Sequence, residues 1–506
     1  MKFELLGNYL DGHFELPQTS GPSAAPIIIK RSCPADLSLR LWECPVDYTF
    51  IDPVIESAHQ GFILWKRTPL AERINYLRKY QEEVKKRSDD IALAIALEVG
   101  KPLWEAKTEA NAVIAKVDVT INDSLPRMAN KTIEDILPNT RGHISYKPLG
   151  PCFIIGPFNF PCHLANGQIL SALIAGNSII FKPSEKTCYS SQILIECFHA
   201  AGFPKGVINL IQGDGEAARR ILSDKKIKGI FFTGSKEVGQ KILRSTYEDL
   251  SKLVSLELGG KNAAIVHQDA NIDHALTELV KGAFLTAGQR CTSTSTVYIH
   301  EDHQHQFIER FHEVAKRIII DHPVDFEKEP FMGPLVDQAA VDSYLLFMGM
   351  AKREGLEEIM RGKLLERKSS GHYVSPSIHY SEKFLPKSHF LMSEIFGPNC
   401  TFIPYRDIEQ AIEMTNSSEY GLAASVFTAD KNIFKKCIED IDTGLVNLNR
   451  STVGASSKLP FGGVKSSGNY RPAALTTIDA CVYQQSSLEV DSNITDSLDS
   501  IKGLEL

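Results

Sequence analysis

The spacing of apolar positions predicts two kinds of structure in the first part of the chain. Residues 6–16 alternate between apolar and polar side chains around an Asp-Gly pair, which predicts a β-hairpin. Residues 17–48 contain several Pro and Ser and are expected to be irregular. Between residues 53 and 136 apolar positions recur every three or four residues, most clearly in 71–77 and 89–97, so this part is expected to be helical.

A different rhythm begins near residue 150, where short apolar runs alternate with helical patterns. The expected strands are 152–155, 178–181, 207–211, 229–233, 263–266 and 296–300, and the expected helices are 164–175, 190–201 and 272–285. Strands that alternate with helices pair in parallel and are buried on both faces, so they read as continuous apolar runs. The pattern therefore predicts an α/β protein with doubly wound parallel sheets.

Composition narrows the class of protein. A chain of 506 residues exceeds one ordinary core, so two or three domains are expected. The fractions of hydrophobic (43%) and charged (23%) residues are typical of a folded globular protein. A net charge of −7 without a basic block argues against nucleic acid or an anionic membrane as a partner. No apolar run approaches the ~20 residues of a membrane helix, and the N-terminus lacks the pattern of a secretory signal.

The ten cysteines show no Cys-x-x-Cys pair and no nearby histidine at zinc spacing. We therefore expect neither a metal site nor a disulfide framework, and a reducing, cytoplasmic compartment fits best.

Two glycine loops compete as the site of a dinucleotide phosphate. The first, Gly213–Ala218, formally fits G-x-G-x-x-A after an expected strand. Its Asp214 and Glu216 would repel a pyrophosphate at close range. The loop is therefore better explained as an ordinary strand-to-helix turn.

The second loop also follows a strand and opens a helix. Gly234 lets the backbone turn, Ser235 can cap the helix, and the helix amides that run on to Gly239 would meet the phosphates. On the loop alone, a plain capped helix is an equal alternative. Lys182 and Glu185 end an earlier strand of the same sheet, where ligands of parallel sheets bind, so a ribose site competes there with simple surface charge.

Cys291 and Glu257 offer the chemistry of a covalent enzyme. A cysteine can attack an aldehyde carbon, and a carboxylate can later activate the water that releases the acid. Asn159 follows another strand end, among apolar residues, where its amide can donate to a developing oxyanion.

Together these segments resemble the aldehyde dehydrogenase superfamily, in that family's order and over about residues 55 to 490. The matching segments are Gly156–Pro161, Phe181–Glu185, Phe232–Gly239, Glu257–Gly260, Gly288–Thr292, Glu394–Pro398 and Pro460–Gly463. The resemblance implies that Cys291 is the nucleophile, that Glu257 is the base, and that Asn159 with the Cys291 backbone N–H forms the oxyanion hole. It implies NAD as the cofactor, and the charge of Glu185 disfavours the 2′-phosphate of NADP. The residues implied for NAD binding are Lys182, Glu185, Gly234, Ser235, Gly239, Glu394 and Phe396.

The resemblance also implies an architecture of two domains and a flap. The expected divisions are an NAD-binding domain at 1–125 and 148–257, a catalytic domain at 258–465, oligomerisation segments at 126–147 and 466–490, and a tail at 491–506. The oligomerisation segments are expected to form a small β flap that pairs subunits, because their strands leave edges that need a partner. A homodimer or a homotetramer is expected.

The stretch Asn447–Pro472 is similar to the succinylglutamate-semialdehyde dehydrogenases of arginine catabolism. This resemblance implies a small semialdehyde substrate with two carboxylates. Arg450 would supply charge, and Gly454, Ala455 and Ser456 would supply N–H groups and a hydroxyl. A purely structural ion pair is the alternative for Arg450.

Several alternatives stay open at this point. Lys261 and Lys465 depart from that subfamily, so glutamate semialdehyde or another carboxylate-bearing semialdehyde is the nearest alternative substrate. A catalytically silent homologue would have lost Cys291, Glu257 or Asn159, and all three are present. CoA-acylating relatives often lack the hydrolytic carboxylate, so Glu257 argues against that activity.

Overall fold

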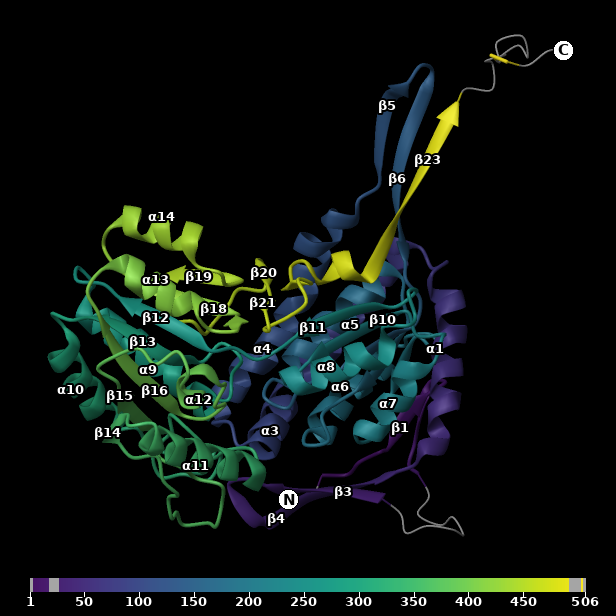
Figure 1. The fold of residues 1–506 in the computed structure, drawn as a ribbon. Helices are drawn as coiled ribbons and strands as arrows, with labels where there is room; N and C mark the ends of the chain where they lie inside the picture. Colours follow the sequence, from purple (N-terminus) through teal and green to yellow (C-terminus); the bar gives the residue numbers. More distant parts are fainter. Residues whose placement is uncertain (1–2, 18–26, 491–501, 504–506) are drawn as a thin grey trace.

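The computed structural model describes residues 3–17, 27–490 and 502–503, which form two α/β domains and a projecting flap (Figure 1). The first domain contains a seven-stranded sheet in the order β11-β10-β7-β8-β9-β1-β2. Its strands are β7 (Cys152–Ile155), β8 (Ile179–Lys182), β9 (Ile208–Leu210), β10 (Gly229–Thr233), β11 (Leu253–Glu257), β1 (Asn8–Leu10) and β2 (His13–Glu15). Strands β7 to β11 pair in parallel, and the β1–β2 hairpin adds an antiparallel edge.

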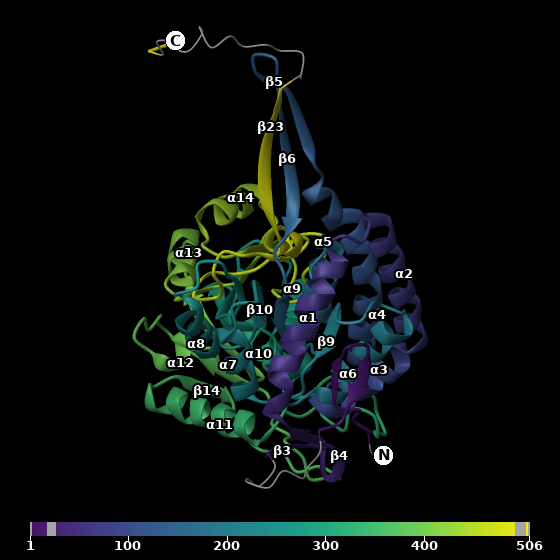
Figure 2. The ribbon, with the colours of Figure 1, turned by 90° about the vertical axis from the view of Figure 1, so that its right-hand side faces the viewer.

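Helices cover this sheet as the strand–helix alternation predicts. They are α5 (His163–Ala175), α6 (Cys188–Ala200), α7 (Gly215–Ser223) and α8 (Lys236–Thr246), with α1 (Ile51–Trp65), α2 (Leu70–Lys86), α3 (Ser88–Val99) and α4 (Leu103–Val119) from the N-terminal part. Figure 2 shows α1 running along the outside of the domain. Helix α4 packs against α3 and α5.

The second domain contains another seven-stranded sheet, in the order β14-β15-β16-β13-β12-β18-β19. Its strands are β12 (Asn262–Val266), β13 (Thr294–His300), β14 (Glu357–Met360), β15 (Ser377–Tyr380), β16 (Asn399–Tyr405), β18 (Ala423–Phe427) and β19 (Leu445–Leu448). Its helices are α9 (Ile272–Phe284), α10 (Gln304–Ala315), α11 (Gln338–Arg353), α12 (His389–Met392), α13 (Ile408–Asn416) and α14 (Lys431–Asp440). All pairs except β14–β15 are parallel, so the expectation of two doubly wound parallel sheets is confirmed.

The flap is a three-stranded antiparallel sheet that extends away from both domains (Figures 1 and 2). It joins β5 (Lys131–Leu137) and β6 (Thr140–Pro148) to β23 (Val482–Val490), in the order β23-β6-β5. Every residue of β5 is exposed, and so is all of β23 after Val482. The expected tail, 491–506, lies almost entirely outside the described residues.

The expectation of irregular structure over residues 17–48 is wrong. Strands β3 (Ile27–Cys33) and β4 (Asp36–Val46) form an antiparallel hairpin, while residues 18–26 lie outside the described part. The signal was present as the alternation of Leu37, Leu39 and Leu41, which Pro45 and the serines obscured. Across the described residues, no helix has both the length and the apolar character that crossing a membrane requires.

The close packing of α1 can be tested at Gly61, with Gly349 of α11 as the control. A Cβ on Gly61 would lie 2.1 Å from the carbonyl carbon of Gly206, whereas a Cβ on Gly349 in α11 would meet no atom within 4 Å. Gly61→Ala is expected to lower the free energy of unfolding by about 1–3 kcal/mol through overpacking. The matched variant Gly349→Ala is expected to raise it by roughly 0.5–1 kcal/mol through helix propensity. Urea denaturation of both variants measures these changes, and equal effects would contradict the close approach.

Candidate active site

Two cavities meet at Cys291 and Glu257, between the two domains. The larger has a volume of about 1080 Å3 and opens onto the first domain, beside the ends of β8 and β10. The smaller has a volume of about 320 Å3 and lies among α4, α5 and the segment 454–457. Cys291 and Glu257 line both cavities. A group bound in either cavity therefore reaches the same thiol and the same carboxylate.

Cys291 differs from the other cysteines in its exposure. All ten cysteines lie among the described residues and are free thiols, and nine of them are buried while Cys291 is half-buried. Burial and the nearby carboxylates of Glu394 and Glu257 together raise the pKa of the Cys291 thiol to about 12, although Arg290 lowers it. These surroundings favour the protonated thiol, and a positive charge close to the sulfur would favour the thiolate.

A left-handed turn precedes the nucleophile. Thr286, Ala287 and Gly288 have φ angles of 54°, 53° and 69°, and the two non-glycine residues are buried. Such conformations cost about 1–3 kcal/mol each at non-glycine residues and persist where the surroundings hold them. Glycine is required at position 288, because a Cβ there would lie 2.2 Å from the Gly397 carbonyl oxygen.

Glu105 of α4 holds this turn. Its carboxylate accepts the backbone N–H of Thr286 at 3.2 Å and also the Thr286 hydroxyl. It forms an ion pair with Arg290, and its side chain is only 1% exposed. One buried carboxylate therefore fixes the backbone on the approach to Cys291.

A second buried pair supports Asn159. Lys101 donates to Glu109 at 2.7 Å, and both side chains are fully buried. The same ammonium donates to the Asn159 carbonyl at 2.8 Å, so the backbone of the loop after β7 is held in place. The Asn159 amide donates to the carbonyl of Gln289 at 2.9 Å, which leaves its second N–H for another acceptor.

Glu257 is the last residue of β11, and its side chain is buried. Its Oε2 has no hydrogen-bond partner within the described structure, and burial raises the pKa of this carboxyl well above the ordinary value. Buried unpaired carboxylates are costly, so burial favours the protonated form of this group, and a hydrogen bond from a donor would favour the ionised form.

The larger cavity contains the second glycine loop, as the sequence predicts for a phosphate site. Ser235 is the N-cap of α8, with its hydroxyl accepting Val238 N–H at 3.4 Å, and it lines the cavity together with Gly234. Gly239 does not line the cavity; it allows α8 to approach Leu258, which a Cβ would meet at 2.8 Å.

In the first glycine loop, Gly213–Ala218, the helix N-terminus that a phosphate would need is already occupied. Asp214 caps α7, and one carboxylate oxygen accepts Glu216 and Ala217 N–H at 3.0 and 3.1 Å. Its other oxygen accepts the Tyr48 hydroxyl at 2.8 Å. The amides that a phosphate would need are therefore already used by a negative group, in agreement with a structural turn.

The other residues expected for the cofactor lie around the same cavity. Lys182 is buried, donates to the Pro183 carbonyl at 2.9 Å and has its pKa lowered by burial, while Glu185 is exposed at the cavity wall. Glu394 accepts Gly260 N–H at 3.0 Å, and burial raises its pKa to about 7. Phe396 packs edge-on against Phe158 with ring centroids 5.9 Å apart. These carboxylates, backbone amides and aromatic faces fit a nucleotide with ribose hydroxyls.

Gly454, Ala455 and Ser456 line the smaller cavity, but Arg450 does not. Arg450 is exposed, and its carbonyl accepts the Ser425 hydroxyl, so the segment turns away from the cavity. The structure thus does not bring Arg450 to the smaller cavity with the other predicted substrate residues, and its contact with substrate stays a prediction. Gly454 has a φ angle of 82°, which turns the backbone of the three-residue segment into the cavity wall.

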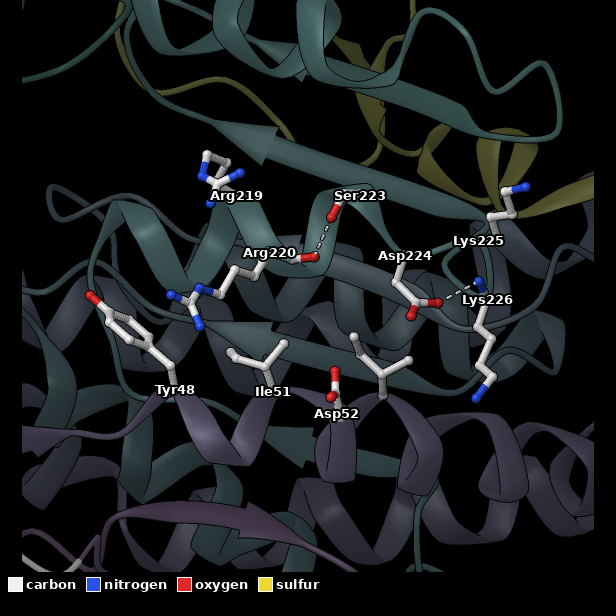
Figure 3. A pocket seen from close by; sticks show the side chains of 10 residues that line it. Tyr48, Ile51, Asp52, Arg219, Arg220, Ser223, Asp224, Lys225 and Lys226 are labelled. Atoms are coloured by element: carbon white, nitrogen blue, oxygen red, sulfur yellow. Dashed lines mark hydrogen bonds between the residues drawn. The ribbon is translucent and has the colours of Figure 1, made fainter. Parts of the chain in front are cut away.

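A third cavity, of about 670 Å3, lies between α1 and α7 (Figure 3). Three of its four cations are already paired: Arg219 and Arg220 with Glu216, and Lys226 with Glu56 at 2.6 Å. Arg220 also stacks on Tyr48 at 4.4 Å. This cavity is lined neither by Cys291 nor by any of the predicted site residues. We therefore assign the chemistry to the two cavities that meet at Cys291. Nowhere in the described part of the chain do three His, Cys, Asp or Glu side chains gather as a metal site requires.

The sequence did not reveal the roles of Glu105 and Glu109 of α4, or of Lys101, which lies just before that helix. The three residues recur every four positions, and Glu105 and Glu109 lie on one face of α4. A lysine and two glutamates at this spacing ordinarily indicate a solvated face, so only their burial distinguishes them.

Comparison with known proteins agrees with this arrangement. Residues 45–486 match the model of the aldehyde dehydrogenase family. The protein named N-succinylglutamate 5-semialdehyde dehydrogenase of Novosphingobium aromaticivorans is 36% identical over 447 residues, which cover 87% of this chain and 92% of that protein. The protein of the same name in Vibrio cholerae is 34% identical over 88% of this chain and 90% of its own length. The crystal structure of 1-pyrroline-5-carboxylate dehydrogenase from Thermus with bound NAD is 26% identical, with a TM-score of 0.88 over 96% of this chain and 93% of that one.

Removing the Lys101 ammonium tests the support of Asn159. Lys101→Met leaves Glu109 buried without its partner, so the free energy of unfolding is expected to fall by about 3–5 kcal/mol. It also frees the Asn159 carbonyl, and kcat is expected to fall about 10- to 100-fold with little change in KM. The double variant Lys101→Met with Glu109→Gln should recover much of the stability but not kcat. A double variant that is stable and has wild-type kcat would show that this pair does not position Asn159.

Proposed function

This chain belongs to the aldehyde dehydrogenase family, and we propose that it oxidises N-succinyl-L-glutamate 5-semialdehyde to N-succinylglutamate with NAD, in arginine catabolism. The observation that carries the proposal is the convergence of two cavities on Cys291 and Glu257. The larger cavity has the size and lining for a dinucleotide, and the smaller one has room for an acyl chain. The names of the relatives from Novosphingobium and Vibrio support the choice of substrate.

The residues around the junction suit covalent aldehyde oxidation. The Cys291 thiolate adds to the aldehyde carbon, and the second N–H of Asn159 and the backbone N–H of Cys291 stabilise the resulting oxyanion. Bound NAD supplies the acceptor for the hydride that leaves this carbon, so the aldehyde is oxidised to a thioester on Cys291. Glu257 then takes a proton from water, the hydroxide attacks the acyl carbon, and the acid leaves as the C–S bond breaks.

Named residues would hold the cofactor in the larger cavity. Gly234, Ser235 and the N-terminal amides of α8 would face the pyrophosphate. Lys182 and Glu185 would meet the adenosine ribose, and the charge of Glu185 disfavours a 2′-phosphate. Glu394 and Phe396 would lie at the nicotinamide ribose. NAD in a structural relative with a TM-score of 0.88 supports this assignment.

We also propose that the flap pairs subunits into a homodimer or a homotetramer. Strand β23 has an unpaired edge, because β6 occupies only one of its sides. Apolar side chains on the flap are exposed, including Leu137 (53%) and Leu488 (62%). An edge strand with exposed apolar residues favours pairing with another copy of itself. The ten free thiols support a reducing compartment such as the cytoplasm.

Glutamate semialdehyde is the second candidate substrate. The structural similarity to 1-pyrroline-5-carboxylate dehydrogenase, at 26% identity, supports this candidate. The support is weaker than that for the first candidate, whose relative is 36% identical. Both substrates carry a carboxylate that the 454–456 segment is suited to bind, so the segment alone does not separate them.

NADH production with three aldehydes tests the substrate. Succinylglutamate semialdehyde is expected to have the highest kcat/KM, glutamate semialdehyde a lower one, and a neutral aldehyde of similar length the lowest. Because both of its carboxylates would accept hydrogen bonds from the protein, succinylglutamate semialdehyde is expected to have a kcat/KM about 100-fold or more above that of the neutral aldehyde. A higher kcat/KM for the neutral aldehyde would reject the dicarboxylate assignment. Cys291→Ala, measured in parallel, should form neither an acyl adduct nor NADH.

The role of Glu257 has a pH signature. Because burial raises the pKa of this carboxyl, its basic form is gained only well above pH 4.5, and the hydrolysis rate should rise with pH through that raised pKa. Glu257→Gln is expected to give a burst of NADH with one equivalent per site and then to slow at least 100-fold. Steady-state turnover that is unchanged in the variant, or that does not depend on pH in the wild type, would exclude Glu257 as the base.

A further inference from the structure

One lysine in the smaller cavity has no carboxylate partner. Lys116 of α4 is 2% exposed and lines the cavity. Its ammonium donates to the Ala474 carbonyl at 3.0 Å, and it forms no ion pair with any carboxylate of the described residues. Asp123 acts on it only through longer-range attraction, and Asp123 is itself 3.9 Å from Lys458. Two of the three N–H donors of Lys116 are therefore left for a ligand.

The other charges in the cavity wall are already compensated. Glu109 is paired with Lys101 at 2.7 Å, and Arg290 is paired with Glu105. Glu257 is buried with its Oε2 atom unpaired among the described residues, and this burial favours its neutral form. Lys116 is thus the uncompensated charge in the wall of this cavity, as far as the described residues extend. An isolated buried cation is unfavourable, and an anion that enters the cavity would remove that cost.

Unpaired polar atoms on α5 lie in the same wall. The Nδ1 atom of His163 is buried without a hydrogen-bond partner, and so is the Oε1 atom of Gln168. Between them, Gly167 gives the Lys116 side chain room to cross α5, because a Cβ there would lie 3.3 Å from the Lys116 Cε. In the tautomer with a proton on Nδ1, His163 can donate to the same anion as Lys116. Within the part of the chain described here, His163 Nδ1 has no other partner, whereas the Oε1 atom of Gln168 is an acceptor and donates nothing to an anion.

We infer that Lys116 and His163 form an anion-binding end of the smaller cavity, which takes a carboxylate of the aldehyde substrate remote from the aldehyde group. The inference rests on the proposed function for the identity of the substrate. The N–H groups of Gly454, Ala455 and Ser456 donate to no acceptor in the described structure, and they provide a separate place for a second carboxylate. A dicarboxylate aldehyde therefore finds two groups of donors in one cavity, and a neutral aldehyde leaves Lys116 unpaired.

The experiment compares Lys116→Met with two other variants. Lys116→Arg keeps the charge, and Lys107→Met makes the same substitution on the exposed side of α4, where Lys107 is 3.8 Å from Asp89. For each variant, kcat/KM is measured with succinylglutamate semialdehyde, glutamate semialdehyde and a neutral aldehyde of similar length. Binding of the product N-succinylglutamate to the NAD-loaded enzyme is measured by calorimetry.

Lys116→Met is expected to lower kcat/KM for the carboxylate-bearing aldehyde about 10- to 100-fold, mainly through KM, and to weaken product binding similarly. The neutral aldehyde should change less than about threefold, which also shows that the variant is folded. Lys116→Arg should restore part of the loss, and Lys107→Met should match the wild type. A loss by Lys116→Met that is equal for all three aldehydes, or no loss at all, would overturn the inference.

These outcomes separate the inference from the proposed substrate. If the wild type prefers glutamate semialdehyde and Lys116→Met removes that preference, the anion site is supported and the proposed substrate is wrong. If the wild type prefers succinylglutamate semialdehyde and Lys116→Met keeps that preference, the substrate stands and the anion site is overturned. A wild type that prefers the neutral aldehyde overturns both.

Discussion

The buried carboxylates of α4 are the constraint on which the active site depends. Glu105 holds the turn before Cys291, which leads into the second sheet, and Glu109 with Lys101 holds the loop of Asn159, which leaves the first sheet. The nucleophile and the oxyanion donor therefore take their spacing from one helix rather than from either sheet. The hydrogen bonds of Glu105 also offset the conformational free energy of Thr286 and Ala287, whose left-handed backbone costs about 1–3 kcal/mol each.

Burial also controls when the reactive groups become charged. It raises the pKa values of Cys291, Glu257 and Glu394, so it favours the neutral forms of all three groups. Three ionised acids so close together would repel one another in a medium of low polarity. A cation beside Cys291 would favour the thiolate, and a hydrogen bond from water to Glu257 would favour its ionised, basic form. The charged forms that the reaction needs would therefore be favoured when ligands bind.

The strands and the nucleophile were predictable because their signals are local. The apolar runs marked β7 to β10 and β12 closely, and the Glu257, Cys291 and Asn159 segments occur in a recognisable order. The hairpin of β3 and β4 was not predicted, because prolines and serines in and around the strands hide the alternation. The roles of Glu105 and Lys116 depend on contacts with residues far along the chain, which a single sequence does not reveal. The position of Arg450 outside the smaller cavity was not predictable for the same reason, since the direction of a loop depends on its tertiary packing.

The junction at Glu257 also sets an order of events in time. In the described part of the chain, Glu257 is buried and lines both cavities, so these cavities are the routes by which water can reach the carboxylate. While dinucleotide fills one cavity and an acyl chain fills the other, the thioester is sheltered from bulk solvent. Hydrolysis must then wait until one of the occupants withdraws far enough to admit a water molecule. Because an acyl chain on Cys291 would be held covalently, the larger cavity is the side through which water would reach Glu257 during hydrolysis.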